Sequence, residues 1–575
     1  MIHTYFSFLK KITTIIFHSP RLVALFLLLM ISGQIGVYAQ SFTYAHTYGA
    51  GHFDEALAIA ADNNNNLYMT ATFIGQWAWR EGDTLQSSGG TDFAIVRLDA
   101  QGQPVWVRSG GGRVDDELSQ LAVLPDGSAL AAAGWMRDTL VLGNDTLTTE
   151  GLSGDNGLLV KYDSNGNLQW ARQWAGKGIS RITALINGDN GQIYAGGIFT
   201  DTLLINDTDT LVASGGFDML VARYDANGDL LGYKQLGGSQ TEVLNTIALS
   251  PNGFLYVGGY FVGNTGLGAF NLQSAGESDA LLLKTDNEGN VWWAKQFGGQ
   301  YAESIERMEV DGNGNLLLGG VFTDQTTWGD ISLTGWGITD IVLAQTDSEG
   351  SPIWVVNVGS EQGDALNDLT LDAQNNIYLA GNIGGTTVFG DNFVLYSTGN
   401  SDAFAAKFDA LGTPLWAQSA GGTLFDSGNS IWVANDGYCY WAGTYIGQAN
   451  FEGFVLSGNG MADMFVAQID QSIIDVAISP DLPNANNYPQ LTAYPNPATE
   501  FVWVKIPASF LAGNTQITLS MPNGQVVYQT DLYACNSNTD GNFLHQILLH
   551  DLPKGVYILT LQNEKMLSSA KIVYM

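Results

Sequence analysis

Two aspartates and two tryptophans lie close together in the segment Asp279–Gly299, which reads DALLLKTDNEGNVWWAKQFGG. Paired carboxylates are the groups that most glycosidases use to cleave glycosidic bonds, and tryptophan rings present large flat faces for contact with a ligand. Taken alone, the segment is therefore a candidate site for glycoside hydrolysis.

The same arrangement recurs along most of the chain, which changes this interpretation. The first acid, or its equivalent, occurs at intervals of 61 to 64 residues, at Asp92, Asn156, Asp218, Asp279, Asp340, Asp402 and Asp463. A second aspartate follows seven residues later in every copy, and in six copies it opens a D-x-x-G turn. A catalytic pair occurs once in an enzyme, so we expect these repeated aspartates to accept hydrogen bonds from turn amides. By the same reasoning, the tryptophan that follows the turn in five copies packs between neighbouring sheets.

Each copy holds four strand-like segments in about 61 residues, which is the size of one propeller blade. The last copy stops after three strands at Asp470, and the fourth pattern is found in FTYAHTYGAG, which begins at Phe42. There Tyr44 stands in the place of the tryptophan, Tyr48 lies on the same strand face, and Gly49 begins the glycine pair. We therefore expect the N-terminal strand to pair outside residues 464–469 and to close the ring, which removes free sheet edges.

The repeat resembles the SBBP-type seven-bladed β-propeller repeats over residues 42–470. This resemblance implies an all-β fold in which residues 41–474 form a seven-bladed β-propeller closed by the N-terminal strand. It implies little about function, because propellers serve as binding scaffolds, hydrolases and lyases alike.

The first 39 residues have the pattern of a secretory signal peptide. Lys10, Lys11 and Arg21 precede the apolar run Leu22–Ile31, and small residues before Gln40 predict cleavage between Ala39 and Gln40. The run is shorter than the roughly 20 residues that span a bilayer, so we expect no transmembrane anchor after processing.

A second domain follows the repeats. Residues 475–490 are rich in proline and asparagine and predict a linker, and residues 491–575 contain enough strand-like segments for a small β-sandwich. The segments YPNPATEFVWV, MPNGQVV, LPKGVYILTL and KIV resemble the type A C-terminal sorting domain of the type IX secretion system of Bacteroidota. The residues that carry this resemblance are Pro495, Asn496, Pro497, Gly524, Gly555, Tyr557 and Lys571. It implies that the type IX machinery is a partner and that the protein is secreted or attached to the outer surface of the cell.

Composition excludes several other functions. Acidic residues outnumber basic ones 56 to 22, and the formal charge of −34 disfavours nucleic acid as a partner. The chain has two cysteines, Cys439 and Cys535, in different predicted domains, which excludes a disulfide framework. Neither a histidine cluster with metal-ligand spacing nor a G-x-S-x-G or P-loop motif occurs. We therefore predict no cofactor, with structural calcium the one metal left open by the Asp-rich turns.

These observations favour a non-enzymatic, monomeric protein that binds an unidentified protein or glycan through the loops or the central channel of the propeller. The alternative is a polysaccharide-active hydrolase or lyase. It would rest on unrepeated acids in a loop on the channel side of one blade, such as Asp115, Asp116 and Glu117.

Overall fold

The computed structural model describes residues 41–471 and parts of residues 492–574. The gaps in the first range are residues 50, 81, 144, 150–153, 207, 391–392 and 435–436. The described parts of the second range are residues 492–494, 501–506, 515–520, 526–532, 543–549, 552, 555–562 and 567–574. The chain divides into a repeat unit, Gln40–Ser472, and a C-terminal unit that includes Ile473–Met575. Nearly all regular structure in the described residues is β-strand, which confirms the all-β prediction.

The strands of the repeat unit pair in sets of four antiparallel strands. The first three sheets contain β2 (Glu55–Ala61), β3 (Leu67–Phe73), β6 (Asp92–Leu98) and β7 (Pro104–Gly112); β8 (Glu117–Val123), β9 (Ala129–Met136), β12 (Asn156–Asp163) and β13 (Leu168–Gly176); and β14 (Ser180–Asn187), β15 (Ile193–Phe199), β18 (Asp218–Tyr224) and β19 (Leu230–Leu236). A short 3₁₀ segment, Asp189–Gly191, lies between β14 and β15.

Three further sheets repeat this order, and a last one includes the N-terminal strand. They contain β20 (Thr241–Leu249), β21 (Leu255–Val262), β24 (Asp279–Thr285) and β25 (Val291–Gly299); β26 (Glu303–Val310), β27 (Leu316–Phe322), β30 (Asp340–Thr346) and β31 (Pro352–Gly359); β32 (Ala365–Leu371), β33 (Ile377–Ile383), β36 (Asp402–Phe408) and β37 (Pro414–Ala420); and β38 (Ser427–Val433), β39 (Tyr438–Tyr445), β42 (Asp463–Asp470) and β1 (Ser41–Tyr48).

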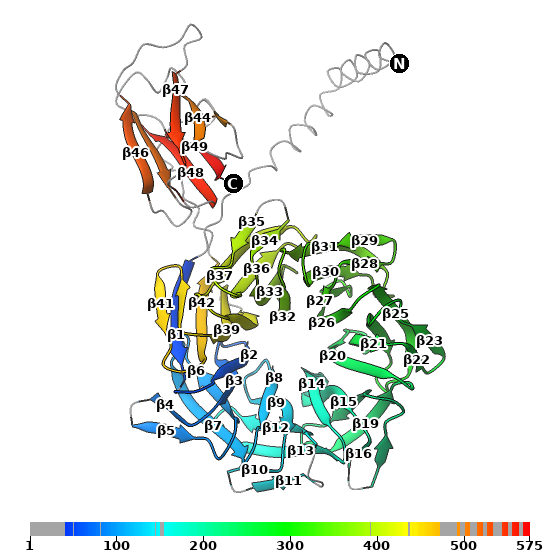
Figure 1. Ribbon diagram of the computed structural model, residues 1–575. Coiled ribbons are helices and arrows are strands. Elements are labelled where there is room, and N and C mark those ends of the chain that lie inside the picture. Colours follow the sequence, from blue (N-terminus) through cyan, green and yellow to red (C-terminus); the bar gives the residue numbers. More distant parts are fainter. Residues whose placement is uncertain are drawn as a thin grey trace, which may run out of the picture. The chain divides into compact units, whose positions relative to one another are not determined.

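The first strands of successive sheets contact one another from β2 through β8, β14, β20, β26 and β32 to β38, and β38 contacts β2. Figure 1 shows the sheets of this unit following one another around a ring, with these first strands toward its centre.

The third strand of each sheet is buried on both faces, and its sequence shows why. Every residue of β24 is buried. Leu281 and Leu283 pack in the core shared with the preceding sheet, whereas Ala280 and Leu282 pack in the core shared with the following sheet. Because successive side chains of a strand point to opposite faces, an unbroken apolar run suits a strand that is covered on both sides.

A short hairpin connects the second and third strands of each repeat. These hairpins are β4 (Gln76–Arg80) with β5 (Asp83–Gln86), β10 (Thr139–Leu142) with β11 (Asp145–Thr148), β16 (Thr202–Leu204) with β17 (Thr210–Val212), β22 (Asn264–Leu267) with β23 (Phe270–Gln273), β28 (Gln325–Trp328) with β29 (Ile331–Thr334), β34 (Thr386–Phe389) with β35 (Phe393–Tyr396), and β40 (Gln448–Phe451) with β41 (Phe454–Ser457). Four of them extend the outer edge of the preceding sheet, where β10, β16, β28 and β34 pair with β7, β13, β25 and β31.

The N-terminal strand β1 is the outermost strand of the sheet that also contains β42. It runs antiparallel to β42, from Ser41 opposite Asp470 to Tyr48 opposite Met464, with a register shift between Phe42 and Tyr44. The ring of Phe42 stacks on Trp441, with 6.1 Å between the ring centroids. These contacts join the first described residues of the chain to the last strand of the repeat unit.

The C-terminal unit contains two antiparallel sheets. One has the order β43 (Thr492–Tyr494), β44 (Phe501–Ile506), β47 (Phe543–Leu548), and the other has the order β46 (Val526–Leu532), β45 (Thr515–Ser520), β48 (Gly555–Gln562), β49 (Leu567–Tyr574). Val502, Val504 and Ile506 of the first sheet share one apolar core with Leu519 and Leu559 of the second. Alternate apolar residues of β44 are thus buried, as the sequence pattern predicts.

Candidate functional site

In six of the seven repeats, the second aspartate holds the turn that follows it. One carboxylate oxygen of Asp286 accepts hydrogen bonds from the backbone N–H groups of Glu288 and Asn290, at 3.0 and 2.8 Å. Gly289 closes this turn with a φ of 81°, a conformation that favours glycine. The same pair of bonds is made by Asp99, Asp163, Asp225, Asp347 and Asp409. The predicted structural role of these aspartates is confirmed.

The first aspartate and the tryptophan of the opening segment are also framework residues. Asp279 is buried and accepts hydrogen bonds from the backbone of Ala275 at 2.9 Å and the side chain of Gln296 at 3.0 Å. Its burial raises the pKa of its carboxyl group. The ring of Trp293 lies against Gly350 in the turn of the next repeat. The acids and this tryptophan therefore connect strands and sheets and do not form a glycosidase pair.

A further acid is buried at the start of the first strand in six of the seven sheets. Glu303 accepts a hydrogen bond from the backbone N–H of Gly299 at 2.9 Å, and its burial raises its pKa to about 7. The other members of this series are Asp54, Asp116, Glu242, Asp364 and Asp426, all buried, with Ser180 in the third sheet as the exception. The prediction that Asp116 is unrepeated is therefore wrong. Its carboxylate accepts a hydrogen bond from the Arg137 backbone at 3.0 Å, and burial raises its pKa to about 7.

This buried series predicts that stability falls as pH rises. A carboxyl group with a raised folded-state pKa binds its proton more tightly in the folded protein, so its stabilising effect is lost as pH rises through about 7. For Glu303 alone we expect the free energy of unfolding to fall by about 2 kcal/mol between pH 5 and pH 8. Denaturant unfolding of Glu303→Gln should show a shallower pH dependence than the wild type. Substitution of the exposed Glu288 by Gln should leave the wild-type slope, and an equal slope in both variants would contradict the assignment.

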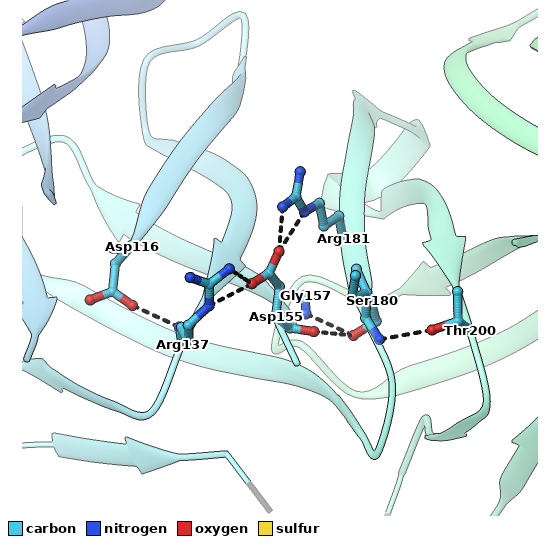
Figure 2. Close-up of polar contacts among 8 residues, drawn as sticks. Asp116, Arg137, Asp155, Gly157, Ser180, Arg181 and Thr200 are labelled. Atoms are coloured by element: carbon cyan, nitrogen blue, oxygen red, sulfur yellow. Dashed lines mark hydrogen bonds and ion pairs between the residues drawn. The ribbon is translucent and has the colours of Figure 1, made fainter. Parts of the chain in front are cut away.

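An unrepeated cluster of charged residues lies at the exception, where the second and third sheets meet. Asp155 is 1% exposed, and its two carboxylate oxygens each bind one arginine. The Nε atom of Arg137 donates to one oxygen at 2.8 Å and the Nε atom of Arg181 donates to the other at 2.8 Å, with the Nη2 atom of each arginine on the same oxygen. Figure 2 shows the two guanidinium groups converging on this carboxylate from different elements. Elsewhere the position of Asp155 is occupied by Thr91, Phe217, Ser278, Thr339, Ser401 and Ala462.

The local sequence explains why the cluster forms here. Two buried positions that are acidic in most repeats hold Asn156 and Ser180, whose side chains carry no charge. The Ser180 hydroxyl accepts a hydrogen bond from the backbone N–H of Gly157 at 3.0 Å (Figure 2). It also donates to the carbonyl of Trp174 at 2.6 Å. The acid of this repeat is instead Asp155. It lies next to Arg137, which directly follows β9, and Arg181, which lies at the start of β14. A comparison of the repeats position by position would have singled out Asp155 beside Asn156 in the sequence, but not the two arginines that bind it.

An aromatic ring and two further acids complete the surroundings of the arginines. The guanidinium carbons of Arg137 and Arg181 lie 5.4 and 4.9 Å from the centroid of the Trp135 ring. Glu117 faces Trp135 across the β8–β9 ladder. Burial raises the pKa of Glu117, and burial with the charge of Glu117 raises the pKa of Glu55 on the neighbouring first strand. We call Glu117, Trp135, Arg137, Asp155 and Arg181 the arginine cluster.

The two arginines of the arginine cluster are partly exposed. Asp155 is occupied by its two arginines, whereas the side chains of Arg137 and Arg181 are 42% and 41% exposed. Guanidinium groups in a fixed orientation bind anionic oxygens through paired hydrogen bonds. Of the three acids proposed for catalysis, Glu117 belongs to this cluster, Asp116 is buried in the framework, and Asp115 accepts a backbone hydrogen bond from Thr91 at 3.0 Å.

The residues predicted to close the ring lie on β1 and directly after it. Tyr44 lies against Gly102, as Trp106 lies against Gly166 in the next repeat. The Tyr48 hydroxyl donates a hydrogen bond to the Gly102 carbonyl. Gly49 has a φ of 143°, and a Cβ atom there would lie 2.8 Å from a carboxylate oxygen of Asp463.

The remaining predicted site residues divide between the described and undescribed parts of the chain. Tyr557 is buried in the C-terminal core, and Gly555 and Lys571 lie on β48 and β49. The predicted cleavage residues Ala39 and Gln40 lie outside the described residues, as do Pro495, Asn496, Pro497 and Gly524.

The described residues hold neither a metal-binding cluster nor a membrane-spanning helix. Within that part of the chain, no group of three or more His, Cys, Asp and Glu side chains is placed to hold a metal ion. The same residues contain no helix with the length and apolar character needed to cross a membrane. Cys439 is buried and makes no disulfide bond, and Cys535 is not among the described residues.

Comparison with known proteins finds partial similarities to the repeat unit and a match to the C-terminal unit. The regulatory protein FlaEY of Caulobacter vibrioides is 26% identical over 212 residues, which are 36% of this chain and 22% of that protein. The chain thus spans less than a quarter of the length of this relative. Among solved structures, Sqt1 from Chaetomium thermophilum aligns with 74% of this chain and 99% of its own, at 11% identity and a TM-score of 0.36. The β-propeller domain of the Trilobed protease from Pyrococcus furiosus aligns with 75% of this chain and 94% of its own, at 8% identity and a TM-score of 0.33.

The C-terminal unit identifies the export route. Residues 492–575 match the family described as the secretion system C-terminal sorting domain. This range contains both sheets of the unit and its buried core. The protein therefore carries a sorting domain of the type IX secretion system and is exported through that system, to the cell surface or into the medium.

Proposed function

We propose that this protein is an exported β-propeller that binds its ligand without catalysis, and that the arginine cluster contacts the ligand. The observation that carries the proposal is the absence of repetition: the framework acids recur in nearly every sheet, whereas Arg137, Asp155 and Arg181 occur together at one junction. Residues of a repeat protein that break the repeat without serving the core are the ones available for recognition.

The proposed architecture is a monomeric seven-bladed propeller of the SBBP type, formed by residues 41–474. The pairing of β1 with β42 and the contact between β38 and β2 support closure by the N-terminal strand. A signal peptide of residues 1–39, a linker of residues 475–490 and a β-sandwich of residues 491–575 complete the proposed domains. The core shared by the two C-terminal sheets supports the sandwich.

Binding fits the arginine cluster better than hydrolysis does. Asp155 is occupied by two arginines, and Asp116 is fully buried and accepts a backbone hydrogen bond from Arg137, so neither carboxylate is accessible to a substrate as a nucleophile or a base. The rival function, a polysaccharide-active hydrolase or lyase, is favoured by one observation. Glu55 and Glu117 lie on neighbouring first strands, and burial together with the charge of Glu117 raises the pKa of Glu55. Glu117→Gln would abolish cleavage under the rival function.

The binding function is tested with the full secreted chain. The chain is immobilised and screened against neutral and acidic polysaccharides and against surface proteins, with products analysed for cleavage. Binding without new chain ends supports the proposal. Cleavage that is lost in Glu117→Gln would establish the rival function, and binding of no probe would contradict both.

Deletion of residues 492–575 is expected to stop export across the outer membrane. The sorting domain carries the address, so the truncated protein should accumulate inside the cell envelope while its repeat unit stays folded. Fractionation and immunoblotting of whole cells and medium measure this. Truncated protein at the cell surface in wild-type amounts would show that the export signal lies elsewhere.

A further inference from the structure

We propose that Arg137 and Arg181 bind the single anionic group of an acidic saccharide, either a carboxylate or a sulfate. The inference deepens the proposed binding function and rests on it. Asp155 and Trp135 are positioning residues, because they hold the two guanidinium groups and leave part of each exposed.

The two guanidinium groups retain unused hydrogen-bond donors. Each arginine uses its Nε and Nη2 atoms on Asp155, and within the described residues neither Nη1 atom donates a hydrogen bond. Asp155 compensates one of the two positive charges, and the partly exposed Glu117 beside Arg181 is the other acid near the pair. The unused donors belong to side chains that are about two-fifths exposed, so a ligand in solvent has access to them.

The orientation of these donors is fixed before a ligand arrives. Asp155 is 1% exposed and fixes each guanidinium plane by two hydrogen bonds, and the ring of Trp135 lies within 5.4 Å of both. Free arginine side chains lose considerable rotamer entropy when they bind, whereas arginines that are already fixed lose less. Planar, paired N–H donors fit the oxygens of a carboxylate or a sulfate.

The neighbouring acids favour a saccharide over a ligand with several negative charges. Glu117 lies beside Arg181 and Trp135, and Glu55 lies on the adjoining strand. Carboxylates accept hydrogen bonds from sugar hydroxyl groups, but they repel additional carboxylates of an acidic peptide. The formal charge of −34 for the whole chain repels a polyanion as well. A sugar with one anionic group and several hydroxyl groups matches both parts of the site.

The test measures the affinity of the full secreted chain for short saccharide probes by calorimetry. The probes are a disaccharide of one galacturonate and one galactose, a singly sulfated galactose disaccharide and a neutral galactose disaccharide, and the first two distinguish a carboxylate from a sulfate. We expect the preferred acidic probe to bind at least tenfold more tightly than the neutral one. Arg181→Gln should weaken the binding of the preferred acidic probe at least tenfold, and Arg137→Gln should do the same.

Arg172→Gln is the matched control. Arg172 also stacks on a tryptophan, with its guanidinium carbon 5.4 Å from the Trp170 ring, and its side chain is 37% exposed. It lies on the repeated outer strand β13, so its loss should change affinity less than twofold. Thermal unfolding of each variant shows whether it is folded. If Arg181→Gln is unfolded, Arg181→Lys replaces it, because lysine keeps the charge but loses the paired donors.

The outcomes separate this inference from the proposed function. Binding of acidic probes with equal losses in the Arg181 and Arg172 variants would overturn the site while leaving the binding function intact. Equal affinity for acidic and neutral probes, or tighter binding of a tetraglutamate peptide, would overturn the ligand class. If the chain binds a surface protein but none of the saccharides, the inference alone is overturned. If it binds none of the probes, the inference and the proposed function are both overturned.

Discussion

Removal of residues 41–48 is expected to abolish stable folding of the repeat unit, whereas removal of residues 1–40 is not. Without β1, strand β42 has a free edge and its sheet loses the buried side chains of Phe42, Tyr44 and Ala45. Burial of one large apolar side chain contributes about 1.5–3 kcal/mol, so the two aromatic residues alone contribute roughly 3–6 kcal/mol. Many domains have a total stability of only about 5–15 kcal/mol.

The measurement compares two chains, one beginning at Ser41 and one beginning at Gly49. The longer chain should be monomeric on size exclusion and unfold cooperatively. The shorter chain should aggregate, because an exposed strand edge can pair with another molecule. A shorter chain that is monomeric and unfolds within a few degrees of the longer one would show that β1 is not needed for closure.

The strands of the repeat unit could be predicted in detail because each is specified locally and repeated. The spacing of Asp279 and Asp286 delimits β24, and the D-x-x-G turn delimits the start of the next strand. Counting strands placed the missing partner of β42 at Phe42, more than 400 residues away, because an incomplete sheet requires one more strand. The bulge between Phe42 and Tyr44 was not predictable, since it depends on how β1 fits the twisted edge of β42.

The arginine cluster could not be predicted by counting alone. The repeat identifies only the residues that the sheets share. In the second sheet the position of the first acid holds the amide Asn156, and the acid lies one residue earlier, at Asp155. Arg137 follows β9 and Arg181 lies on β14 of the next sheet, so only the packing of the two sheets brings both to Asp155. The error at Asp116 has a different cause, because its counterparts at the same place in the repeat are aspartate in some copies and glutamate or serine in others.

The second large effect concerns the glycine pair that ends the outer strands. Gly299→Ala is expected to lower the free energy of unfolding by about 3 kcal/mol, in the range of severe packing defects. A Cβ atom at Gly299 would lie 1.8 Å from the carbonyl oxygen of Gln325, which belongs to the hairpin that pairs with this strand. The obstacle is backbone and cannot rotate away, so β28 must separate from β25 and lose its pairing at Thr326.

Gly232→Ala is the control for this prediction. Gly232 also lies on an outer strand, β19, but a Cβ atom there would have no neighbour within 4 Å. Because alanine restricts the unfolded chain more than glycine does, this variant should be neutral or slightly more stable. Urea unfolding of both variants measures the difference, and hydrogen exchange should be faster at Thr326 in Gly299→Ala alone. Equal stability of the two variants would mean that the hairpin is held to β25 by contacts other than the close backbone approach, and that the glycine pair is not what joins neighbouring repeats.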